Sequence, residues 1–242
     1  MTHFFSFGQN LPADAPSMDL FTWPHFLILS ALLLLGILVA KTYKACAKRS
    51  IYRKVVAVST LVSILPLQAA LLITGDYAPW NLPLHLCHLG IAVILVDAFY
   101  ENKATKEISF VLTLPGAFLA LIFPDWANHP LFNLLLIQSF AFHALLVYYI
   151  SMRFAAGEIL PKLRHIWMPL LFLAALLPII FFLNLKLGTN FFFLNRAAPG
   201  SPMVLIQEAF GLFYIPALFG VVLLLMLAIY GLLGALKSRD SN

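Results

Sequence analysis

The sequence predicts an all-α, polytopic integral membrane protein, a single bundle of seven transmembrane helices over residues 1–242. Hydrophobic residues make up 62% of the chain and charged residues only 10%, whereas soluble domains carry about 25% charged residues. Seven segments stay apolar over roughly the 20 residues that cross the hydrocarbon core of a bilayer. A chain with so few charges cannot cover a surface that faces water, so we expect a lipid environment.

The seven predicted spans follow the apolar segments in order. They cover residues 19–40, 55–75, 82–100, 107–123, 131–152, 166–185 and 204–236. No basic region followed by a short apolar core precedes the first span, so we expect that span to act as its own insertion signal. The last segment is longer than a span requires, which predicts that it tilts or projects beyond the membrane.

The lysines and arginines predict the orientation. Six of the 15 lie in residues 41–54, and seven more follow the third, fifth and seventh spans, whereas the opposite side has only Lys186 and Arg196. Cytoplasmic loops carry the excess of basic residues. We therefore expect an outside amino terminus and a cytoplasmic carboxy terminus in the cell membrane, plasma or inner. Topology accounts for the net charge of +5, so we do not expect nucleic acid as a partner.

Polar side chains inside the spans are costly in hydrocarbon, so each one requires a reason. Most of them would lie in the outer half of their helices, which predicts a cavity open to the outer leaflet. The alternative is that they form interhelical hydrogen bonds that only stabilise the bundle. The candidates are His25, Gln68, Asp76, His85, Cys87, His88, Asp97, Gln138, His143, Gln207, Glu208 and Tyr214.

The segment 80–88 concentrates these side chains. Pro83 suits the first turn of a helix, and His85 and His88, three residues apart, would share a helix face. Cys87 would point about 100° away from His88, so its base has to come from another helix. His143 and His25 are the candidates for that base.

Three interpretations of this segment remain open. A histidine-activated Cys87 attacks an ester and forms an acyl thioester. Alternatively, His85 and His88 bind a metal with a third ligand such as Glu208 or His143. In the third interpretation Cys87 is an apolar filler. The other cysteine, Cys46, is predicted in a cytoplasmic loop, so we expect no disulfide.

The loop before the last span holds the only two basic residues predicted outside. Two such charges in one loop suggest an anionic ligand, for example a lipid phosphate, bound by Asn190 and Arg196. The alternative is that Lys186 and Arg196 anchor the loop at the membrane surface.

Four motifs together resemble the YwaF-like family of bacterial membrane proteins, over residues 19–236. They are LPLHLC at 82–87, FTWPHF at 21–26, FH at 142–143 and GTNFFFL at 188–194. The family typically has GTNY, so Phe191 replaces a tyrosine here and any role of its hydroxyl is absent. The family is distantly similar to a eukaryotic multi-pass acyltransferase that remodels ether phospholipids and to androgen-induced hydrolases of fatty-acid esters. Those enzymes pair an intramembrane cysteine or threonine with a histidine on a later helix, which implies Cys87 and His143 here.

These observations lead to one functional hypothesis and one alternative. The hypothesis is a thiol-dependent acyltransferase or ester hydrolase that acts on a membrane lipid, with Cys87 as nucleophile, His143 as base and no metal or cofactor. The alternative is a non-enzymatic small transporter or a lipid- or solute-binding membrane protein. Helical rise would place Cys87 roughly 7–8 Å and His143 roughly 18 Å into their predicted spans, so tilt or a deeper third span must close that gap. The supporting polar residues are His85, His88, His25, Gln68, Gln138 and Glu208.

Overall fold

The computed structural model describes residues 3–7, 10–12 and 14–239, with side chains to Ala235. Its described residues form helices and connecting segments without a strand, and seven helices are long and apolar enough to span a membrane, which confirms the predicted fold class. The helices are α1 (Trp23–Ala45), α2 (Arg49–Thr74), α3 (Leu86–Phe99), α4 (Lys103–Ile108), α5 (Leu114–Ile122), α6 (Leu134–Ala155), α7 (Trp167–Leu187), α8 (Met203–Phe210) and α9 (Tyr214–Arg239). Short turns join or extend them: η2 (Pro79–Asn81), η3 (Ser109–Thr113), η4 (Leu163–His165), η5 (Phe191–Phe193) and η6 (Gly211–Phe213).

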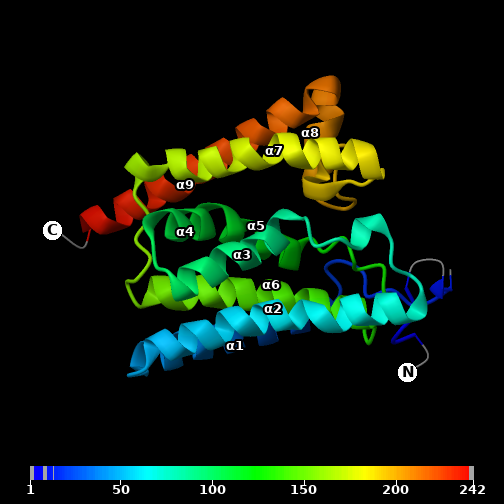
Figure 1. Ribbon diagram of the computed structural model, residues 1–242, viewed down its shortest axis with the longest axis horizontal. Helices are drawn as coiled ribbons and strands as arrows, with labels where there is room; N and C mark the ends of the chain where they lie inside the picture. Colours follow the sequence, from blue (N-terminus) through cyan, green and yellow to red (C-terminus); the bar gives the residue numbers. More distant parts are fainter. Residues whose placement is uncertain (1–2, 8–9, 13, 240–242) are drawn as a thin grey trace.

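The helices are arranged in two parts (Figure 1). Helices α7, α8 and α9 form one layer, and α1 to α6 pack together beneath it. A buried carboxylate on α4 joins the two parts, because Glu107 accepts hydrogen bonds from the Tyr230 hydroxyl at 2.7 Å and the Lys162 backbone N–H at 3.0 Å. The His165 ring nitrogen Nδ1 also lies 2.8 Å from Glu107.

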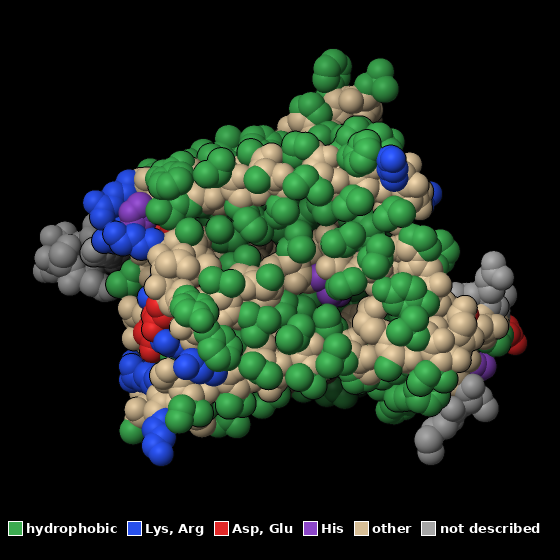
Figure 2. All heavy atoms as spheres, viewed as in Figure 1, with side chains coloured by type: hydrophobic (Ala, Val, Ile, Leu, Met, Phe, Trp, Pro, Cys, Tyr) green, Lys and Arg blue, Asp and Glu red, His purple; other side chains and the backbone are tan. Residues whose placement is uncertain are grey.

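The described chain starts and ends at opposite ends of the bundle, as seven crossings require (Figure 1). Lysine and arginine side chains gather mainly at the end where α1 meets α2 and α6 ends (Figure 2). The side chains of Lys237 and Arg239, which we counted among the cytoplasmic basic residues, lie outside the described residues. The side of the membrane on which each end lies stays a prediction.

Helix α2 begins at Arg49 rather than at residue 55, so the predicted loop 41–54 was too long. Only residues 46–48 separate α1 from α2. Arg53 is on the helix and donates from Nε to the Ala98 carbonyl at 3.2 Å, while its guanidinium pairs with Glu101. Long basic side chains can reach polar partners at the membrane edge, so the helix continues through positions that the charge count assigned to a loop.

The third span was predicted as one helix over 82–100, but its first part is irregular. The chain makes the turn η2, then runs extended at Leu82 (ψ 135°) and His85 (ψ 156°), and α3 begins at Leu86. Pro79 and Pro83 have no N–H to donate into a helix. His85 therefore precedes α3, and the prediction that it shares a helix face with His88 was wrong.

The seventh span was predicted as one segment over 204–236, but Gly211 divides it. Its φ of 51° and ψ of −116° suit glycine, which has no Cβ to clash with the backbone. The short helix α8 and the long helix α9 therefore run in different directions (Figure 1).

A buried ion network occupies the end of the bundle where α6 ends. Arg153 was predicted in a loop, but it lies on α6 with 0% of its side chain exposed. Its guanidinium pairs with Asp97, which is also fully buried, and with Glu101 and Glu158. Asp97 also accepts a hydrogen bond from the Tyr149 hydroxyl at 2.8 Å. The intramembrane carboxylate that the sequence singled out at 97 thus has a structural partner.

Candidate functional site

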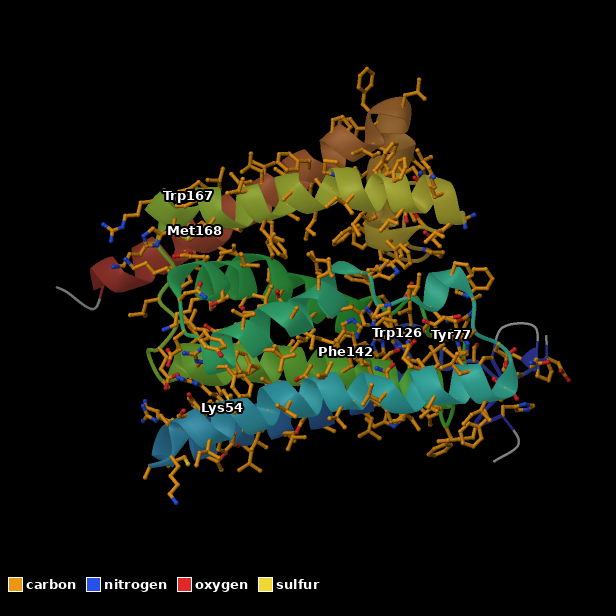
Figure 3. All side chains as sticks on the ribbon, viewed as in Figure 1. Lys54, Tyr77, Trp126, Phe142, Trp167 and Met168 are labelled. Atoms are coloured by element: carbon orange, nitrogen blue, oxygen red, sulfur yellow. The ribbon has the colours of Figure 1, made fainter. Side chains whose placement is uncertain are left out.

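A cavity of about 1170 Å³ is lined by residues of α7 and α9 on one side and of α2, α3, α5 and α6 on the other. Figure 2 shows a histidine side chain recessed among apolar residues on the face viewed, between the two parts of the bundle. Figure 3 shows three of the lining residues, Phe142, Trp126 and Tyr77, in a row from the middle of the bundle toward the end where α1 begins. Seven of the twelve polar residues singled out from the sequence line this cavity: Gln68, Asp76, His85, Cys87, His88, Gln138 and His143.

Cys87 is the second residue of α3 and has a free thiol. The extended residues before α3 advance about 3.3 Å each instead of the 1.5 Å of a helix, which allows Cys87 to lie deeper than a helix from residue 82 would place it. Gly116 on α5 faces the thiol, since a Cβ added there would lie 3.8 Å from Sγ. The missing side chain at Gly116 leaves room beside the sulfur.

His143 is buried on α6, with 7% of its surface exposed. Its Nδ1 lies 2.7 Å from the Ser139 carbonyl oxygen, which can only accept, so Nδ1 carries the proton of the neutral ring. The lone pair is therefore on Nε2. The Trp126 indole stacks on the ring, with centroids 4.8 Å apart and planes 14° from parallel, which holds the imidazole in one orientation.

Cys87 and His143 line the same cavity, but no hydrogen bond joins the thiol to the ring among the described residues. Catalytic hydrogen bonds are often long in structures without substrate and shorten in the complex. The structure therefore brings the two side chains to one space and leaves their direct contact untested.

His25, the other candidate base, is occupied. Its Nδ1 accepts from the Phe21 backbone N–H at 3.1 Å, so Nε2 carries the proton and donates to the Leu121 carbonyl at 3.0 Å. The ring is fully buried and does not line the cavity. Its hydrogen bonds link α1 to α5, and neither ring nitrogen has a free lone pair that could accept the thiol proton.

The neighbouring histidines have different surroundings. The His85 ring packs against Phe191 at 5.3 Å and Phe193 at 5.1 Å between centroids, whereas His88 stacks on Phe142 at 4.8 Å. The third ligand that metal binding would need is missing, since the described residues contain no group of three His, Cys, Asp or Glu side chains placed to hold a metal ion.

The remaining supporting residues differ in position. Gln138 lines the cavity on α6, and Gln68 does so while donating from Nε2 to the Asn81 carbonyl at 3.2 Å. Glu208 is exposed on α8 and does not line the cavity.

Asn190 and Arg196, the predicted head-group residues, lie in a separate hollow of about 320 Å³. The Asn190 side chain donates to the Arg196 carbonyl at 2.8 Å and accepts from the backbone N–H groups of Asn195 and Arg196 at 3.0 and 3.1 Å. These bonds stabilise the loop and satisfy the hydrogen-bonding groups of the Asn190 amide without a ligand. A phosphate contact at Arg196 stays a prediction.

Sequence reasoning missed four lining residues between the predicted fourth and fifth spans. They are Asp125, Trp126, Asn128 and His129, and the search for polar side chains within spans did not include them. Asp125 faces the cavity, where the surrounding protein raises the pKa of its carboxyl. Burial likewise lowers the pKa of His129. The signal that could have found them is a tryptophan between charged and polar residues in a proline-bounded loop, PDWANHP.

Comparison with known proteins gives a family. No curated protein and no solved structure matches the chain. The model of the TMEM164 family matches residues 20–230, which include six of the seven helices that are long and apolar enough to span a membrane and most of the seventh. That match does not bear on the resemblance to the YwaF-like family, which stays a prediction. Because the match covers most of the sequence, the chain belongs to the TMEM164 family.

Proposed function

We propose that this membrane protein is a thiol-dependent acyltransferase or ester hydrolase that acts on a membrane lipid in the cell membrane. Cys87 is the nucleophile and His143 is the general base. The observation that supports the proposal is that both side chains line one cavity and that the histidine tautomer leaves Nε2 free to accept a proton.

The position of Cys87 supports its role as nucleophile. The first backbone N–H groups of a helix have no partner within the helix, and the positive end of the helix dipole lowers the cost of a thiolate there. Cys87 is in the first turn of α3, and the His85 side chain forms no capping bond to it. The same N–H groups can stabilise the negative oxygen that forms on an attacked carbonyl. Gln138 and His85, which line the cavity, are further donor candidates.

The cavity suits a lipid tail. The α9 residues that line it are all apolar and cover one face of the helix: Ile215, Leu218, Phe219, Val221, Val222 and Leu225. Ten residues of helix rise about 15 Å, half of the ~30 Å thickness of the hydrocarbon core. No lysine or arginine of the described residues lines the cavity, and most of its lining side chains are apolar.

The reaction follows from these groups. The Cys87 sulfur attacks the ester carbonyl carbon, and its proton passes to Nε2 of His143. The carbon–oxygen bond to the lipid alcohol then breaks, the alcohol takes the proton from His143, and an acyl thioester remains on Cys87. The hydroxyl of a second lipid, or water, attacks the thioester while His143 accepts its proton and returns it to the sulfur. A lipid acceptor gives acyl transfer, and water gives hydrolysis.

The test compares variants of the purified chain in phosphatidylcholine nanodiscs, with release of lysolipid as the readout. Cys87→Ala and His143→Ala should each abolish turnover, and the double variant should be no worse than either, because the two groups act as one unit. Cys46→Ala, which changes the only other cysteine, should retain turnover.

Equal turnover in Cys87→Ala and the parent would exclude the thiol mechanism. Lipid binding without product in the parent chain would favour the alternative, a non-enzymatic transporter or lipid-binding protein.

A further inference from the structure

The turn η5 holds two aromatic residues in an unfavourable backbone conformation. Phe192 has φ 57° and Phe193 has φ 55°, in the left-handed region where the Cβ of an ordinary residue crowds its own backbone. Such conformations persist when surrounding interactions fix them, and they concentrate at functional sites.

Two helices brace this turn. Asn184 on α7 is buried, donates from Nδ2 to the Phe191 carbonyl at 2.9 Å, and accepts from the Phe191 N–H at 2.8 Å. On the other side, the Tyr214 hydroxyl of α9 donates to the Phe193 carbonyl at 3.0 Å. The backbone on both sides of Phe192 is therefore fixed.

The bracing holds both rings at the wall of the cavity. Phe192 and Phe193 line the cavity together with Cys87. The Phe193 ring also packs on His85, with centroids 5.1 Å apart, and His85 is two residues before Cys87. Relaxing the turn would move these rings, so their position in the cavity depends on the strained backbone.

We propose that Phe192 and Phe193 form a rigid aromatic wall that limits the width of the ligand beside Cys87 and selects a slender, unbranched acyl chain. This inference rests on the proposed function, because it takes Cys87 as the reacting end of the cavity. A braced wall discriminates by width because overpacking a fixed site is costly.

The test measures how fast two reagents of different width modify Cys87. The background is the full-length Cys46→Ser chain in phosphatidylcholine nanodiscs, and the reagents are N-ethylmaleimide and the wider N-(1-pyrenyl)maleimide. Both add the thiol across the same carbon–carbon double bond, so the ratio of their rates cancels the intrinsic reactivity of the sulfur.

Phe192→Ala and Phe193→Ala should each raise the pyrenyl-to-ethyl rate ratio by about fivefold or more, the low end of the penalty for overpacking. Phe181→Ala is the matched control, since this α7 phenylalanine is 41% exposed and does not line the cavity. An unchanged ratio in both turn variants would overturn the wall. If the rate ratio changes but the chain shows no acyl transfer, the aromatic wall would be supported and the Cys87–His143 mechanism would be rejected.

A matched pair of substitutions isolates the backbone strain. Phe193→Gly and Phe193→Ala remove the same ring, but only glycine adopts the left-handed region freely. The glycine variant should melt at a temperature about 2–4 °C above the alanine variant. An alanine variant as stable as the glycine variant or more stable would show that the turn is not strained, and it would contradict a rigid wall.

Discussion

Removing the Arg153 guanidinium should strongly destabilise the bundle while leaving the cavity intact. Arg153 and Asp97 are both fully buried and paired, and Glu101 and Glu158 complete the set of carboxylates around the guanidinium. Arg153→Met keeps much of the side-chain volume but leaves the Asp97 charge without its ion-pair partner. Truncating one partner of a buried pair costs about 3–5 kcal/mol, mainly because the other charge is left buried and unpaired.

That cost converts to a drop in melting temperature of about 6–20 °C for a chain of this size. Tryptophan fluorescence of the purified chain during heating measures it. Arg49→Met is the matched control, because Arg49 is only half-buried and its guanidinium donates to the backbone carbonyl of Lys44 in an exposed hydrogen bond. Surface changes of that kind stay within about 0.5 kcal/mol.

A double variant tests the same ion network more sharply. Replacing both charged partners, as in Arg153→Met with Asp97→Leu, should recover a large part of the lost stability, because no fully buried charge is left unpaired. Glu101 keeps its pairs with Arg53 and Lys106, and the Glu158 side chain is partly exposed. If the Arg153→Met variant melts at the same temperature as the Arg49→Met control, the ion network does not stabilise the bundle.

Three further changes have directions set by the structure. Gly116→Ala should fold normally but lower acylation about tenfold or more, because its methyl would lie 3.8 Å from the Cys87 sulfur, where the acyl group has to fit; a trapped-adduct assay measures this. His25→Phe should lower the melting temperature, since the Leu121 carbonyl loses its buried donor, at about 1–3 kcal/mol. Asp125→Asn should be more stable than the parent at pH 7. The protein around the cavity raises the pKa of this partly exposed carboxyl, so the folded chain holds its proton more tightly and stability falls as pH rises. The gain should therefore be small, and melting curves should show it vanish below pH 3.8, the ordinary pKa of the group.

The positions of the seven helices followed from apolar length, because a bilayer allows only segments that satisfy their own backbone hydrogen bonds. The ends of the helices could not be predicted from apolar length. Arg49 and Arg53 extend α2 because long basic side chains reach polar groups at the membrane edge. The break at Gly211 was also missed, since the run 204–236 is mostly apolar and glycine is tolerated inside membrane helices.

The cavity was predicted in part. Polar residues within spans pointed to Cys87 and His143, and both line the cavity. Trp126, which stacks on His143, was missed because it lies in a connecting segment. The pairing of Asp97 with Arg153 was missed for another reason: the partners are 56 residues apart, and no local pattern connects them.

The most direct test of the proposed mechanism is mass spectrometry of the Cys87 peptide after the purified chain is incubated with phospholipids. The expected result is a fatty-acyl mass on Cys87 that hydroxylamine, which cleaves thioesters, removes. The adduct should be absent from His143→Ala, because without its base the buried thiol remains protonated and inert. If the chain converts its substrate but Cys87 carries no acyl group, even when the acceptor is withheld, covalent catalysis by this cysteine would be contradicted.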